Sequence, residues 1–162
     1  MAPLIHHTSA KTQRAEHQPI EPNRPFRHGI DTAEKLVRLS LAQCSRLSKA
    51  LSDLQERLGY GDATKICSSA VGQILGWFLF EVFTPLGREF VELHDRHLEQ
   101  KDWAPDFVCA TSLKDAFANV YRAAEETEQL GEQLRAHGVV RDEALSELRR
   151  WTLEWRRFAE RA

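Results

Sequence analysis

The chain has 162 residues, 42% of them hydrophobic, and a formal net charge of -2 at pH 7. This length is enough for one domain, or one domain with a tail, and this hydrophobic content is enough for a packed core. The nearly balanced charge argues against a dedicated nucleic-acid binder, whose domain is normally basic.

Residues 1–30 predict a disordered tail, or an arm that becomes ordered on a partner. Pro19, Pro22 and Pro25 recur every third residue, which excludes a helix there. Few large apolar side chains are present, so little burial offsets the entropy lost on ordering. The tail also contains the scattered histidines His6, His7, His17 and His28. Because no thiols accompany them, we expect a solvated tail without a metal site.

Residues 32–58 predict the first helix of a bundle domain that covers residues 31–162. Asp31 and Glu34 have the spacing of a capping box, and Gly59 is a typical helix stop. A narrow apolar seam follows steps of three and four residues: Val37, Cys44, Leu47, Leu51, Leu54 and Leu58. Such a seam suits antiparallel packing inside a bundle, or a homodimer through Leu47, Leu51, Leu54 and Leu58.

Residues 66–86 form the most apolar stretch of the chain and predict a central helix, which Asp62 begins and Thr84-Pro85 ends. A helix that is apolar all round is usually buried inside a bundle. The stretch is also nearly long enough to cross a membrane, but Gln73 and Glu81 within it oppose insertion. The spacing of Gly72 and Gly76 permits another helix to approach closely.

A third helix is predicted over residues 85–100; the alternative is that it forms a single helix with the second one, kinked at Pro85. Within it, Arg88 to His94 (REFVELH) resembles the arginine–histidine spacing of the HEPN helical ribonucleases. The resemblance implies that Arg88 stabilises phosphate charge and that His94 acts in acid–base transfer. Glu89 departs from the polar residue usual in that family. On a continuous helix residues six apart point about 120° apart, so one site needs an unwound helix or a second copy.

His94 and His97 are three residues apart and are neighbours on a helix. With a nearby carboxylate they would be candidates for zinc or iron, but the patterns typical of helical metal sites are absent. We therefore expect boundary histidines, no metal and no cofactor.

The remaining elements have clear local signals. Residues 101–111 predict a connection whose Trp103 and Phe107 plug the end of the bundle. Ser112 and Asp115 open a helix that ends at His137-Gly138, and a last helix starts near Asp142. The chain thus predicts an all-α bundle of four to five helices with a disordered N-terminal tail.

Three cysteines, Cys44, Cys67 and Cys109, are widely spaced and form no CxxC pair. An odd, dispersed set does not suit a disulfide framework or a zinc site. We expect three buried, reduced thiols in a cytoplasmic protein.

The C-terminal helix presents an unusual aromatic and arginine-rich segment. Its aromatic row is Trp151, Trp155 and Phe158, and the flanking arginines that we assign to partner binding are Arg149, Arg156 and Arg157. Tryptophan and arginine dominate interface hot spots, and an amphipathic helix in a groove is a common recognition mode. The alternative is that the aromatics close the domain's own core and the arginines pair with glutamates of the preceding helix.

The sequence therefore favours a non-enzymatic protein–protein interaction module: an adaptor, an immunity-type inhibitor or anti-activator, or a small subunit of a larger assembly. Its partner would be another protein or a second copy. Two alternatives remain open. One is a HEPN-like ribonuclease or toxin using Arg88 and His94, and the other is a protein attached to a membrane through residues 66–86.

Overall fold

The computed structural model describes residues 28–96, 98 and 102–161, and over this part of the chain it contains helices and no strands. The prediction of an all-α bundle is confirmed. The predicted tail over residues 1–30 falls almost wholly outside the described residues.

The first helix, α2, spans Ile30–Leu58, close to the predicted bounds. The predicted capping box is wrong: Gly29 occupies the N-cap, and Asp31 lies in the first turn, where it pairs with Arg96 at 3.2 Å. Gly59 ends the helix with a φ of 78°, in the left-handed region that glycine tolerates best. Leu47 and Leu54 are fully buried and pack inside the bundle, whereas Leu58 at the end of the seam is 39% exposed. The homodimer through this seam stays a prediction.

The second helix runs on past the predicted stop at Thr84. It comprises α3 (Asp62–Phe78), one π-helical turn η1 (Leu79–Phe83) and α4 (Thr84–Glu89). Pro85 has no N–H to donate, and its ring would clash with the carbonyl one turn earlier. The widened turn accommodates this, because the Thr84 N–H donates to the Leu79 carbonyl. The predicted extent of this helix to residue 100 is wrong, since α4 ends at Glu89. The alternative in which it is joined to the second helix is confirmed, because α3, η1 and α4 follow one another without a gap.

A short 3-10 helix, η2 (Val91–Asp95), follows and leads into a long crossover. The crossover ends at Ser112, whose Oγ accepts the Asp115 N–H at 3.1 Å and caps α5 (Leu113–Ala136) as predicted. Gly138 has a φ of 77° and ends this helix, and α6 (Asp142–Glu160) completes the bundle.

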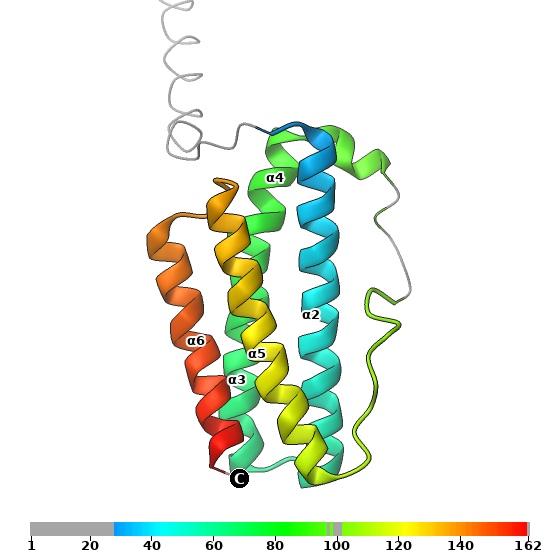
Figure 1. Ribbon diagram of the computed structural model, residues 1–162, viewed down its shortest axis with the longest axis vertical. Helices are drawn as coiled ribbons and strands as arrows, with labels where there is room; N and C mark the ends of the chain where they lie inside the picture. Colours follow the sequence, from blue (N-terminus) through cyan, green and yellow to red (C-terminus); the bar gives the residue numbers. More distant parts are fainter. Residues whose placement is uncertain (1–27, 97, 99–101, 162) are drawn as a thin grey trace, which may run out of the picture.

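The four long helices form a square in which each helix packs against two others (Figure 1). α2 and α6 each pack against both α3 and α5, while α3 and α5 lie diagonally opposite. Neighbouring helices are antiparallel, because the crossover returns the chain to the end of the bundle where α3 began (Figure 1). This is the bundle topology with one long crossover connection.

Buried polar contacts link the helices across this square. The Gln43 amide on α2 donates to Thr127 Oγ1 and to the Ala123 carbonyl on α5, both at 3.0 Å. The Trp77 indole on α3 donates to the Ala144 carbonyl on α6 at 2.8 Å. Since buried polar groups are costly unless they are paired, these contacts help to define the register of the helices.

The crossover descends along the outer side of α2 (Figure 1). The buried Asp53 carboxylate accepts the Ala110 N–H at 2.7 Å, and Lys49 donates to the Ala104 carbonyl at 2.7 Å. Trp103 lies beside the Arg38 guanidinium on α2, and Phe107 lines grooves between the crossover and α2. The prediction that these two rings plug the end of the bundle is wrong, because they cover the side of α2.

We expect replacement of Gly72 by Ala to raise the free energy of unfolding by about 0.5–1 kcal/mol, since glycine inside a helix is less stable than alanine by that amount. A Cβ at Gly72 would meet nothing within 4 Å. Gly131→Ala is the matched control, because its Cβ would lie 2.6 Å from Leu148 Cδ2 and the clash offsets the gain. Urea unfolding monitored by circular dichroism measures both, and equal effects would contradict this account.

Candidate interaction surface

The aromatic row of α6 points mainly inward. Trp155 is 0% exposed, and its indole N–H donates to the Val120 carbonyl on α5 at 2.5 Å. The prediction that Trp155 binds a partner is therefore wrong, because its ring fills the core of its own domain. Phe158 is half-buried, with its ring centroid 5.9 Å from that of Phe117, and Trp151 is half-buried beneath the Arg150 guanidinium, 4.9 Å away.

Two of the three predicted partner-binding arginines are engaged within the domain. Arg149 pairs with Glu132, and Arg156 pairs with Glu128, each at 2.6 Å. Thr152 Oγ1 donates to the same Glu128 carboxylate at 2.6 Å. The alternative prediction, that these arginines pair with glutamates of the preceding helix, is therefore confirmed for Arg149 and Arg156, whose ion pairs connect α6 to α5.

Arg157 has a different environment. It is exposed and lines a shallow groove between the start of α3 and the end of α6, together with Ile66, Glu154, Phe158 and Arg161. Two residues of the predicted partner-binding site therefore lie beside α3: Arg157, which is exposed, and Phe158, which is half-buried. Because residues seven apart share a helix face, Trp151 lies on the same side of α6 as Phe158.

The exposed apolar surface beside them belongs to α3 and to the η1 turn that continues it. Ile66 is 51% exposed, Leu79 50% and Phe80 69%. Between them lie small and polar residues at the three- and four-residue steps of one helix face. We call this the α3 outer face, and it consists of Ile66, Ser69, Gly72, Gln73, Gly76, Leu79 and Phe80.

This face is unusual because the helix that carries it is the most apolar one. Asp62–Glu89 is a helix long and apolar enough to cross a membrane by length and composition, yet only 39% of its most apolar window is buried. A Cβ at Gly72 or Gly76 would meet no described residue within 4 Å, so none of the described helices uses their small size. The sequence indicated close helix approach at these glycines but not that their face points outward.

Charged residues at and near the two ends of α6, together with Glu81 of η1, flank the two ends of the α3 outer face. Near Phe80, a groove is lined by Glu81, Arg141, Glu143 and Glu147. Near Ile66, the groove containing Arg157 also has Arg161 and Glu154. One end is therefore mainly acidic and the other mainly basic. Together with these flanking charges, the α3 outer face makes up what we call the α3–α6 surface.

Arg88 lies in the last turn of α4, and His94 lies beyond the end of that helix. The backbone leaves the helical conformation at Phe90, with φ -120° and ψ 79°, and His94 belongs to η2. The helix therefore unwinds between the two residues, as a shared site would require. Both side chains are exposed, and neither lines the grooves beside α6. His97 lies outside the described residues.

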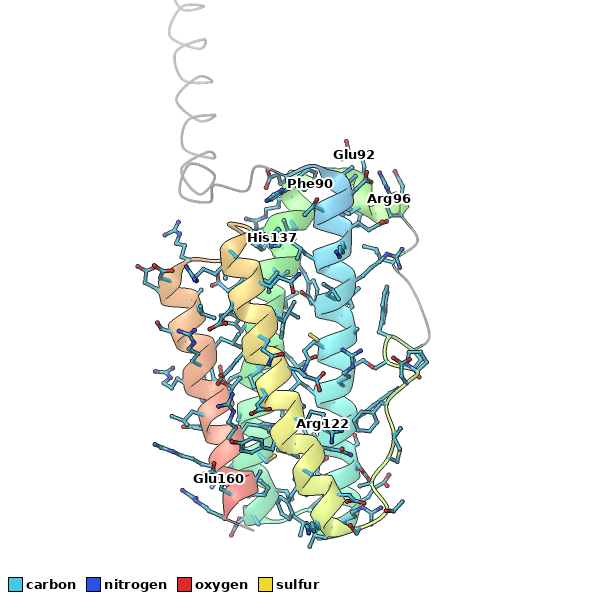
Figure 2. The ribbon with its side chains drawn as sticks, in the orientation of Figure 1. Phe90, Glu92, Arg96, Arg122, His137 and Glu160 are labelled. Carbon is cyan, nitrogen blue, oxygen red and sulfur yellow. The ribbon has the colours of Figure 1, made fainter. Side chains whose placement is uncertain are left out.

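The other end of the molecule offers little additional chemistry. Figure 2 shows Arg122 on α5, where it lines a groove with Arg46 and Phe107 beneath the crossover. Within the described ranges, no group of three His, Cys, Asp or Glu side chains is arranged to hold a metal ion.

Comparison with protein-family models, curated proteins and solved structures finds no match to this chain.

We expect Trp155→Ala to lower the free energy of unfolding by about 3–5 kcal/mol, because it deletes a fully buried ring together with its hydrogen bond to the Val120 carbonyl. Arg157→Ala is the matched control on the exposed side of α6 and should change stability by less than about 0.5 kcal/mol. Urea unfolding measures both. A Trp155→Ala protein as stable as wild type would contradict the buried position.

The three thiols differ in environment, and the prediction that all are buried is wrong for Cys109, which is exposed. Burial raises the pKa of the Cys44 and Cys67 thiols to about 12. Because thiolate is the reactive form, we expect an aromatic disulfide reagent to label Cys109 readily in the folded protein. Cys44 and Cys67 should react only on unfolding. Rapid labelling of a folded Cys109→Ser variant would contradict this.

Proposed function

We propose that this chain is a non-enzymatic, cytoplasmic protein–protein interaction module that acts as an adaptor, an inhibitor or a small subunit of a larger assembly. The observation that carries the proposal is the α3 outer face: Ile66, Leu79 and Phe80 are half or more exposed on a bundle whose core is already filled by other residues. Large apolar side chains gathered on one face of a folded domain are typical of a protein interaction site.

The proposal moves the contact from the C-terminal helix to the neighbouring one. The amphipathic helix that we expected to bind a partner uses Trp155, Arg149 and Arg156 for its own domain. Its exposed Arg157 remains beside Ile66 and contributes to the rim. Protein interfaces usually combine exposed apolar residues with a rim of charged and polar residues.

Two alternatives have weaker support. The ribonuclease hypothesis rests on Arg88 and His94, two exposed side chains separated by a break in the helix. The membrane hypothesis requires α3 to leave the bundle, although it supplies buried residues such as Ile74 and Phe78 to the core. Both stay predictions from the sequence.

A photo-crosslinking amino acid placed at residue 80 tests the proposal. In cells, we expect ultraviolet light to join residue 80 to a discrete protein partner, because Phe80 is 69% exposed at the centre of the apolar end of this face. Residue 108 is the matched control, since Val108 is 77% exposed on the crossover at a different side of the bundle. Equal adducts from both positions, or none from residue 80, would contradict the proposal.

A further inference from the structure

The α3–α6 surface carries opposite charge at its two ends. Three carboxylates and one guanidinium surround the end near Phe80, namely Glu81, Glu143, Glu147 and Arg141. At the other end, beside Ile66, Arg157 and Arg161 outnumber Glu154, and the exposed Lys65 and Asp62 form a pair of their own at 3.7 Å. A surface of this kind is complementary to a copy of itself that runs in the opposite direction.

The apolar residues of this surface are also placed symmetrically about its middle. Gln73 lies midway between Ile66 and Phe80 in the sequence, and the two apolar ends are about 21 Å apart along the helix at 1.5 Å per residue. Gly72 and Gly76 lie near the middle, and a Cβ at either would point into open space. Glycine at the crossing point lets two helix backbones approach closely.

We infer that the occupant of the α3–α6 surface is a second copy of this chain, packed antiparallel about a two-fold axis near Gln73. The inference rests on the proposed function and names its partner. In this arrangement Ile66 of each copy contacts Phe80 of the other, and the acidic end of each copy faces the basic end of the other. A two-fold axis makes both contacts twice, as in any isologous interface.

A parallel pairing is disfavoured by the same charges, because it would place the two acidic ends together. Like charges opposed across an interface are strongly unfavourable. Charge therefore selects the direction of packing, and the glycines determine how closely the helices approach.

Sedimentation velocity of the full chain across a wide concentration range tests the inference. We expect a reversible monomer–dimer equilibrium in the wild type. Gly76→Leu should weaken the dimer at least about tenfold, because a large side chain at the crossing point holds the helices apart. The monomer should stay folded, since nothing in the described part of its own chain lies within 4 Å of the added Cβ. Gly29→Leu, equally open and outside this face, is the matched control.

Charge reversal then tests the direction of packing. Glu143→Lys with Glu147→Lys makes both ends of the surface basic, and Arg157→Glu with Arg161→Glu makes both ends acidic. Each double variant alone should dimerise at least about tenfold more weakly than wild type. An equimolar mixture of the two should recover the dimer. Glu56→Lys with Glu125→Lys, on the exposed sides of α2 and α5, is a control of equal charge change.

Several results would overturn the inference. These are a wild type that is monomeric throughout, a dimer indifferent to Gly76→Leu, or a mixture that does not recover association. Co-sedimentation with anionic phospholipid vesicles in place of dimerisation would assign the face to a lipid surface. A crosslink from residue 80 into residues 1–27 of the same chain would assign it to the tail. A monomer whose residue 80 still crosslinks another protein would remove the self-association and leave the proposed function standing.

Discussion

Each helix in a square of four has only two neighbours, and this constraint determines which side of the most apolar segment is buried and which side stays exposed. α3 packs against α2 and α6 and is diagonal to α5. Two neighbours cover one side of a helix, so Cys67, Ile74 and Phe78 are fully buried while Ile66 and Phe80 remain exposed. A helix that is apolar all round is stable in this position only if its outward side carries small residues or meets a further surface.

The crossover makes the two sides of the bundle unequal. It covers the outer side of α2, where the Asp53 carboxylate accepts the Ala110 N–H and Arg57 donates to the Ala110 carbonyl. Lys49 fixes the same segment through Asp102 at 2.7 Å, and the pKa of Asp102 is lowered chiefly by that hydrogen bond. The long connection between α4 and α5 thus covers α2. Among the described residues, no comparable segment covers α3.

The sequence predicted those parts of the fold that depend on local chemistry. Gly59, Ser112 and Gly138 mark helix ends through backbone conformation and capping, which neighbouring residues decide. It left open whether the helix stops at Pro85 or continues through it, because the π-helical turn that lets the helix continue depends on packing between helices and not on neighbouring residues alone. Nor did it reveal the candidate site. Apolar periodicity identifies a face that avoids water, but the number of neighbours around a helix is a property of the whole bundle.

The same reasoning explains why a protein surface suits this face better than a bilayer. To cross a membrane, α3 would have to give up its contacts with α2 and α6, including the Trp77 hydrogen bond to Ala144. Glu81 would enter the lipid at a cost of about 2.5–3.5 kcal/mol at mid-depth. A protein partner requires none of this, because it covers Ile66 and Phe80 while α3 stays in its bundle. Contact with a protein partner removes these apolar side chains from water, and the hydrophobic effect therefore favours it. In a bilayer the surrounding lipid is itself apolar, so the hydrophobic effect would not drive a contact there.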